Sequence, residues 1–306
     1  MKKALIYLLC GTLILTFATG CEKTLTPKSN NGSSENGTTI DPNAKKNLNT
    51  TILSEKIKGK NNIWENAYTE QDESGLYAQT TELGTTYYFR GEPKNNYLKF
   101  AGIDFRIIRV NEDGSIRIIS EEGTNNNKGY QYNDNSANYT SMYYSDPTNN
   151  VKKAIDEWYA KTITGNNANK VVENAKFCEA ARLNGTNPPS FDCKTDENGK
   201  GKLEMPAGLI TYDETIFAGG WHLGMPKYYL VENEISTWTM TAAYYHESSF
   251  ENSSTACTWY LDGGVGFTFA VRVYYPAVEA RPVLNLKSDI LVTGNGTKDK
   301  PYIVLE

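Results

Sequence analysis

The chain has 306 residues, with 31 Lys and Arg against 36 Asp and Glu, and therefore a formal net charge of -5. A net acidic chain without a basic block lacks the cationic surface that nucleic-acid binding needs, so nucleic acid is not expected among the partners. Two histidines exclude a histidine-rich metal site, and a hydrophobic fraction of 39% excludes a polytopic membrane protein. The 21 tyrosines, beside 10 Phe and 5 Trp, are typical of polar, aromatic contact surfaces.

The first twenty residues have the order of a secretory signal. Two lysines precede an uncharged apolar run over residues 4–18, and small residues follow before Cys21. The run is shorter than the about 20 residues that span a bilayer. Residues 18–21 resemble the lipobox of bacterial lipoproteins, in which the cysteine is diacylated. We therefore predict lipidation of Cys21 and a lipid-anchored protein on the extracytoplasmic face of the cell membrane. A plain signal peptide cut nearby, or an uncleaved anchor, is the alternative.

Residues 22–60 contain no aromatic side chain and are rich in Ser, Thr, Asn, Gly and Pro. Such a segment buries too little apolar surface to offset its chain entropy. The predicted plan is a signal peptide over 1–20, the lipidated cysteine with a flexible linker over 21–60, and an extracellular domain over 61–306. A sub-boundary could fall in the loop near 123–146.

The strongest local prediction is a hairpin. Residues 97–110 alternate and are rich in β-branched side chains, residues 111–114 contain an Asp-Gly turn, and residues 115–120 form the return strand. A short strand is also predicted over 87–91. Three arginines on this hairpin are expected on the solvated side or in a polar strip between layers, rather than in a phosphate site: Arg106, Arg109 and Arg117.

Two helices are predicted from their start signals. One begins after Asn149, places Val151 and Ile155 on one face with Trp158 and Tyr159, and ends near Lys161. The other begins with a capping box in which Thr211 is the cap, and it ends at the following Gly-Gly pair. Residues 169–181 are predicted to form a further helix or an irregular segment.

The last third contains short β segments separated by Gly-rich turns, at 236–240, 258–261, 267–274, 282–286 and 302–305. Together with the helices, this pattern predicts an α+β fold with small antiparallel sheets, two or three helices and long loops.

Three cysteines remain after the signal segment and Cys21. Cys178 and Cys193 enclose a polar loop, and a disulfide between them would stabilise the fold by roughly 3 kcal/mol. The alternative is three free thiols. Cys257 lies on a predicted strand and is interpreted as a small core residue.

Several stretches together resemble an uncharacterised family of surface lipoproteins and secreted proteins from Gram-positive bacteria. They are residues 97–119, the loop from 178 to 193, and residues 206–214, 237–240, 281–288 and 294–304. The closing strands at 238–240, 259–263 and 281–284 are also similar to C-type-lectin-like and formylglycine-generating-enzyme-like domains. This resemblance implies a compact α+β domain. The copper-binding cysteine pair and the calcium motifs of such domains do not occur here, so no cofactor or metal is implied.

Aromatic side chains in this third are the main candidates for ligand binding, because Tyr and Trp dominate many contact surfaces. From the set at 228, 229, 238, 244, 245, 259, 274 and 275 we select Trp238, Tyr244, Tyr245 and Trp259, with Arg281 beside them. Half of the set could equally be core. No catalytic residue is assigned, because the Asp213-Glu214 pair fits a helix cap and His222 has no partner at a recognisable catalytic spacing.

The sequence leaves three functions open. The first is a non-enzymatic binding or adhesion module that recognises a glycan or a host or surface protein. The second is a glycan hydrolase whose two carboxylates are distant in sequence. The third is a structural component of the cell envelope.

Overall fold

The computed structural model describes residues 43–60, 74–126, 128–180, 188–220, 227–248, 254–275 and 278–306. All of them belong to one unit, Ile40–Glu306. The predicted signal peptide and Cys21 lie outside the described residues, so their role stays a prediction. Among the described residues, no helix is both long enough and apolar enough to cross a membrane.

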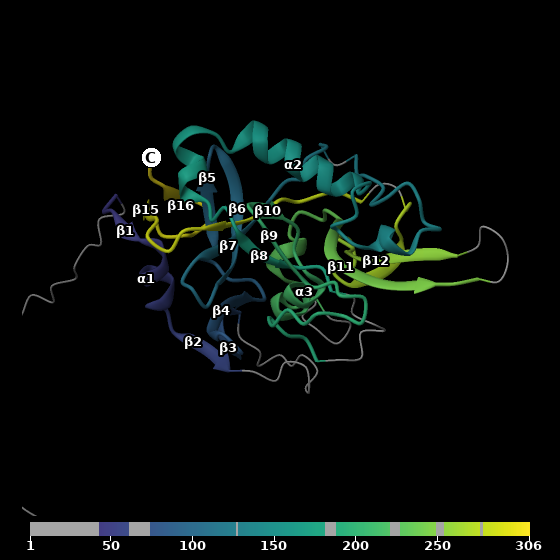
Figure 1. The fold of residues 1–306 in the computed structure, drawn as a ribbon. Coiled ribbons are helices and arrows are strands. Elements are labelled where there is room, and N and C mark those ends of the chain that lie inside the picture. Colours follow the sequence, from purple (N-terminus) through teal and green to yellow (C-terminus); the bar gives the residue numbers. More distant parts are fainter. Residues whose placement is uncertain are drawn as a thin grey trace, which may run out of the picture. The chain divides into compact units, whose positions relative to one another are not determined.

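Eleven strands of the described residues form one large mixed sheet (Figure 1). Its strands are β1 (Lys46–Asn47), β2 (Ile57–Lys60), β3 (Gly75–Thr81), β4 (Gly84–Arg90), β5 (Tyr97–Phe100), β6 (Ile103–Val110), β7 (Ile116–Ser120), β10 (Ala207–Gly208), β14 (Val283–Leu286), β15 (Leu291–Thr293) and β16 (Tyr302–Val304). The order is β1-β15-β16-β5-β6-β4-β3-β2, and β7, β14 and β10 continue the sheet from β6. Only β16–β5 and β2–β3 are parallel pairs within this sheet.

Two smaller antiparallel sheets accompany the large one. The first contains β11 (Thr237–His246), β12 (Thr255–Leu261) and β13 (Thr268–Arg272), and the second pairs β8 (Ala175–Cys178) with β9 (Lys202–Met205). The far ends of β11 and β12 extend away from the large sheet (Figure 1). Register shifts in β11 on both sides of Ala242 change the alternation of its side chains before Tyr244.

The helices are α1 (Leu48–Leu53), α2 (Asn150–Thr162) and α3 (Tyr212–Ala218), with 3-10 turns η1 (Tyr139–Met142), η2 (Gly165–Lys170) and η4 (Tyr229–Val231). Helix α3 contacts β4 of the large sheet and also β11 and β12, so it lies between the two sheets. The coarse prediction of an α+β fold is therefore confirmed, but the sheet that contains β1–β7 is mixed and much larger than the small antiparallel sheets that were predicted.

The predicted hairpin is confirmed. Strands β6 and β7 pair antiparallel, and the turn between them is closed by the Asn111 amide donating to the Ser115 carbonyl at 2.8 Å. Gly114 takes a φ of 80°, a left-handed conformation that glycine adopts without a steric cost. The Asp113 carboxylate accepts from the Ser115 amide and fixes the turn.

Both predicted helix starts are also confirmed. The Asn149 side chain accepts from the Lys152 amide at 2.8 Å, and α2 ends at Thr162. At α3, the Thr211 hydroxyl accepts from the Glu214 amide while the Glu214 carboxylate accepts from the Thr211 amide, which completes the capping box. Gly219 caps the end of α3.

The predicted linker boundary at residue 60 is wrong for residues 43–60. Leu48 and Ile52 are fully buried on α1, while β1 pairs with β15 and β2 pairs with β3. Composition predicted a spacer because the segment has no aromatic residue. Two aliphatic side chains and the hydrogen bonds of two sheet edges are nevertheless enough to fix it.

Two further predictions are corrected. Residues 97–110 are two strands, β5 and β6, because Ala101 and Gly102 both take positive φ angles and turn the chain between them. In the segment predicted as a helix or an irregular stretch, the described residues 169–180 contain the end of η2 and the strand β8, so the helix alternative is wrong. The alternating burial of Ala175 and Phe177 on β8 has the period of a strand.

The hairpin arginines are not on a solvated side. Arg106 and Arg117 are each 1% exposed, and Arg109 is partly buried. Their burial agrees with the second expected placement, a polar strip between layers. Arg106 pairs with Glu232, and its guanidinium lies over the Tyr97 ring at 3.7 Å from the centroid.

Acid should weaken the Arg106–Glu232 pair. Burial tends to raise the pKa of Glu232, but hydrogen bonds from Lys298, Arg106 and Tyr97 outweigh it and lower the pKa to about 2. A lowered pKa contributes stability above the usual 4.5, and this contribution is lost as the pH falls toward about 2. We expect Glu232→Gln to destabilise the fold at neutral pH and much less at about pH 2. Urea unfolding of both proteins across this range measures the difference, and a constant difference would contradict the assignment.

Candidate functional site

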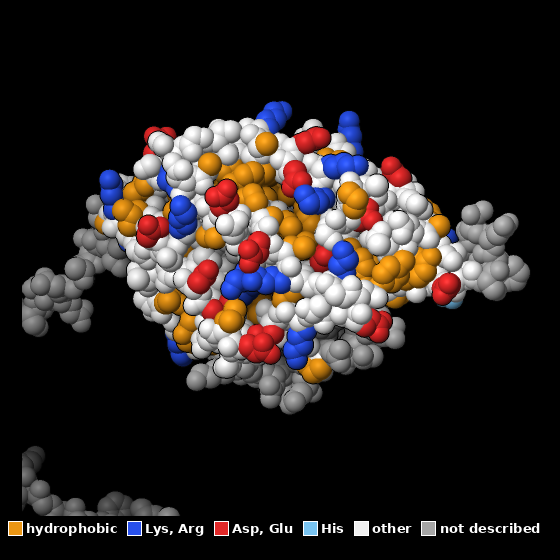
Figure 2. All heavy atoms as spheres, in the orientation of Figure 1, with side chains coloured by type: hydrophobic (Ala, Val, Ile, Leu, Met, Phe, Trp, Pro, Cys, Tyr) orange, Lys and Arg blue, Asp and Glu red, His pale blue; other side chains and the backbone are white. Residues whose placement is uncertain are grey.

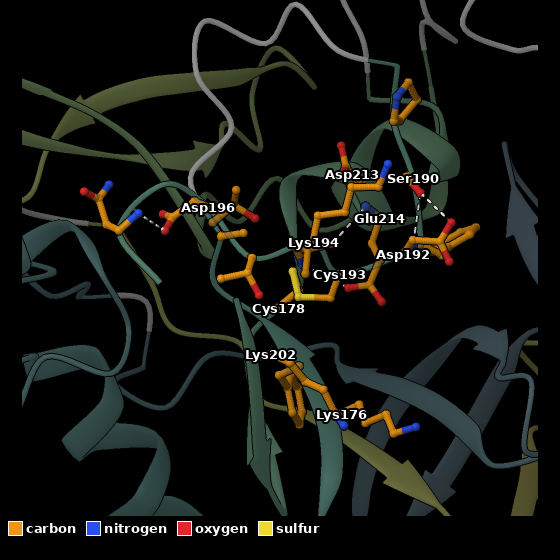
Figure 3. A pocket seen from close by; sticks show the side chains of 18 of the residues that line it. Lys176, Cys178, Ser190, Asp192, Cys193, Lys194, Asp196, Lys202, Asp213 and Glu214 are labelled. Atoms are coloured by element: carbon orange, nitrogen blue, oxygen red, sulfur yellow. Dashed lines mark hydrogen bonds between the residues drawn. A yellow bond between two sulfur atoms is a disulfide. The ribbon is translucent and has the colours of Figure 1, made fainter. Parts of the chain in front are cut away.

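A cleft of about 1480 Å³ opens beside the segment that carries Cys193 (Figure 3). Its walls come from β6 and β7, β8 and β9, residues 188–198, the start of α3, and β11. Figure 3 shows the Cys178–Cys193 bridge in this wall, with Lys176 and Lys202 on the neighbouring strands β8 and β9. Side chains from distant parts of the sequence therefore meet in one recess.

The predicted disulfide is confirmed. Cys178 and Cys193 are bonded, with their Cα atoms 5.5 Å apart, and they are separated by 15 positions in the chain. The bond joins the end of β8 to the segment 188–193, which places that segment on the cleft wall. A disulfide is typical of an oxidising compartment outside the cytoplasm.

The Cys193 segment is also held by packing. Phe191 stacks on Phe217 of α3 with ring centroids 4.0 Å apart, and the Arg109 guanidinium lies 4.7 Å from the Phe191 centroid. The Asp192 carboxylate accepts from the Glu82 amide at 2.9 Å. The position of this wall therefore depends on side chains from α3 and β6 and on a backbone amide of the β3–β4 turn.

A buried ion pair forms the floor of the cleft. The Glu214 carboxylate, 2% exposed, contacts the Arg117 Nε at 2.5 Å and the Arg109 Nε at 3.3 Å. Arg109 also lies 3.8 Å from Glu112. The two cations and the two carboxylates balance, so the floor is nearly neutral.

The pKa of Glu214 reflects these partners. Burial alone raises its pKa, but Arg117, Arg109 and the Thr211 amide outweigh burial and hold the pKa below 4.5. Burial lowers the pKa of Arg117 to about 10, against the opposing effect of Glu214. Both groups are therefore charged at neutral pH. A general acid needs a raised pKa, so Glu214 acts as a fixed anion that holds the two arginines.

Tyrosines line the other end of the cleft. Tyr139 and Tyr245 meet edge to face with centroids 5.4 Å apart, and both line the cleft together with Tyr244. The Tyr245 hydroxyl donates to the Ala137 carbonyl at 2.7 Å, which fixes its ring. Tyr244 is 38% exposed. This end offers aromatic faces to a ligand beside polar side chains such as Asn198.

The structure divides the five predicted binding residues. Tyr244 and Tyr245 line the cleft. Trp238 is fully buried and donates from its indole to the Tyr130 carbonyl, and Arg281, 1% exposed, donates to the Ser120 and Leu230 carbonyls. These two predictions are corrected, because both side chains serve the core. Trp259 is partly buried against Tyr212, at 4.4 Å between centroids, and does not line the cleft.

The other candidate residues have structural roles or lie outside the residues that the structure describes. His222 lies outside the described residues. The Asp196 carboxylate accepts from the Asn198 and Lys200 amides and so closes a polar turn. Among the described residues, no group of three His, Cys, Asp or Glu could hold a metal ion. Cys257 is a buried free thiol.

Sequence reasoning missed Phe191, Tyr139 and Arg109 as lining residues. Phe191 is the only aromatic residue between the two bonded cysteines, so the predicted disulfide could have drawn attention to it. Tyr139 lies in a long loop of Asn and Tyr residues, and only the fold brings it to Tyr245.

No protein-family model, no curated protein and no solved structure matches this chain. The family resemblance therefore stays a prediction, and function has to be inferred from the residues and the cleft geometry.

Proposed function

We propose that this chain is a lipid-anchored extracytoplasmic binding protein that recognises a glycan in the cleft beside Cys178–Cys193. The observation that carries the proposal is the tyrosine-lined end of the cleft, where Tyr139, Tyr244 and Tyr245 stand beside polar side chains. Flat aromatic rings pack on the apolar faces of sugars, while nearby polar groups bond to the hydroxyls.

The ion pairs at the floor of the cleft favour a glycan whose contacts with the floor do not depend on a charge. Arg109 and Arg117 are already paired with Glu214, so a ligand gains little from them unless it displaces a buried ion pair. The disulfide supports an extracytoplasmic location. The lectin-like resemblance favours the same class of function and stays a prediction.

The hydrolase alternative needs two carboxylates with different protonation states on either side of the scissile bond. Glu214, the most buried carboxylate of the cleft, has a lowered pKa and two arginine partners, which disfavours it as the acid. Glu214 therefore does not support the hydrolase alternative.

A glycan array tests the proposal. The unit Ile40–Glu306 should bind at least one class of oligosaccharide, and Tyr244→Ala should weaken that binding about tenfold, because a stacking face is lost. Phe269→Ala is the matched control, because Phe269 is similarly exposed, at 41%, but does not line the cleft. An array without any bound sugar would contradict the glycan proposal and leave a protein partner as the ligand.

A further inference from the structure

A second recess lies on the other side of Tyr244. It has a volume of about 860 Å³ and lies along the ends of β11, β12 and β13. Tyr244 lines both recesses, so its ring forms a wall that they share. On the face shown in Figure 2, hydrophobic side chains gather over the β11–β12 end of the molecule.

Pairing across the three strands places the polar groups of this groove in one row. Tyr244 pairs with Cys257, and Cys257 pairs with Arg272, so the three side chains share a face of the sheet. Cys257 is the buried middle residue of this row, and Tyr244 and Arg272 are exposed on either side of it. The groove therefore has an aromatic wall and a cationic wall.

The charge of the groove differs from that of the cleft. Arg272 and His246 line it, and none of the described residues lining it carries a carboxylate. Arg272 donates to the Tyr274 hydroxyl at 2.5 Å, and no ion pair joins it to an acidic side chain anywhere in the described part of the chain. Its guanidinium retains donors in the planar arrangement that matches a carboxylate.

Three tyrosines line the groove together with this cation. Tyr244, Tyr274 and Tyr275 are 38%, 36% and 47% exposed and all line the groove. Exposed rings next to an arginine without an acidic partner suit a ligand with both an apolar face and a negative charge. A sugar ring that carries a carboxylate has both features.

We propose that this groove binds a uronic-acid residue of the glycan, with its carboxylate on Arg272 and its ring against the tyrosines. This inference rests on the proposed glycan-binding function. Because Tyr244 is shared, a saccharide chain that stacks on it in the cleft continues directly into the groove. The ligand class is then an acidic oligosaccharide that contains neutral and uronate residues.

Calorimetry with two tetrasaccharides of equal length tests the proposal. Chitotetraose is neutral, and the hyaluronan tetrasaccharide carries glucuronate at alternate positions. We expect the unit Ile40–Glu306 to bind the hyaluronan fragment about fivefold more tightly, the effect of one partly exposed ion pair. Arg272→Gln should remove this preference. Arg272→Lys should retain part of it, because the charge stays while the planar pair of donors is lost.

The matched control is Lys161→Gln, which removes the same charge from the exposed end of α2, far along the chain from both recesses. It should keep the preference, and circular dichroism should show that all variants are folded. Equal affinity for the two saccharides, or a preference that Arg272→Gln leaves intact, would overturn the groove proposal alone. Arg272-dependent binding of an aspartate-rich peptide without binding of hyaluronan would also overturn it, in favour of a protein partner. No binding of any saccharide would instead remove the proposed function.

Discussion

Glu214→Gln should lower the free energy of unfolding by about 3–5 kcal/mol. The glutamine has nearly the same shape and can still accept from the Thr211 amide, so the capping box loses little. The loss comes from Arg117, which is 1% exposed and would remain charged in the interior without its counterion. Arg109 loses the same partner. Urea or thermal unfolding of both proteins at neutral pH measures the effect.

Two variants show whether charge is the cause. Asp104→Asn breaks the exposed pair with Lys99 and should cost less than about 1 kcal/mol. Glu214→Gln combined with Arg117→Met removes both buried charges, so it should be less destabilised than Glu214→Gln alone. Because the pKa of Glu214 is lowered, its contribution is complete above 4.5 and disappears as the pH falls through the lowered value. A cost no larger than that of Asp104→Asn would show that the pair contributes little.

Local patterns predicted those elements whose causes lie within a few residues. The β6–β7 hairpin depends on the Asp113-Gly114 turn, and α3 depends on Thr211 and Glu214, three positions apart. The Cys178–Cys193 bond was predicted from a wider pattern, because the two cysteines enclose a polar loop and are 15 positions apart. For the hairpin and α3, the interaction that fixes the structure is readable from neighbouring residues.

Contacts distant in the sequence could not be predicted in this way. Trp is a residue type that is frequent at binding surfaces, but Trp238 is buried against Tyr132 and Tyr130, which lie more than 100 positions earlier in the chain. Glu214 was predicted as a helix cap, which is right. Its pairing with Arg117 depends on how α3 is placed against β7. Part of residues 43–60 was misjudged for the same reason, because β1 pairs with β15 near residue 291.

The cleft also depends on contacts between residues that are distant in the sequence. Its tyrosine end joins η1 to β11, and its arginine floor joins β6 and β7 to α3. The sequence contributed Tyr244 and Tyr245 as candidates because aromatic residues are frequent at binding surfaces. It could not distinguish them from Trp238 and Arg281, since burial depends on which face of a strand meets another layer.

Removing the disulfide should destabilise the fold by about 3 kcal/mol and weaken ligand binding at temperatures where the fold persists. The bond closes a segment of 15 positions, and its loss restores chain entropy to the unfolded state. In the folded state, the freed segment carries Phe191 and Asp192, which line the cleft. Denaturant unfolding of Cys178→Ser with Cys193→Ser measures the first effect, and glycan affinity at low temperature measures the second.

Reduction provides the matched control for this prediction. Wild type treated with a thiol reductant should resemble the double variant, whereas the same reductant should leave the double variant unchanged. Cys257→Ser should respond to the reductant as wild type does, because Cys257 is a free buried thiol. If the midpoint of unfolding did not move on reduction, packing of Phe191 against Phe217 and the Asp192–Glu82 hydrogen bond would be holding the segment without help from the bond. Binding would then be equally insensitive to reduction, since the cleft wall would stay in place.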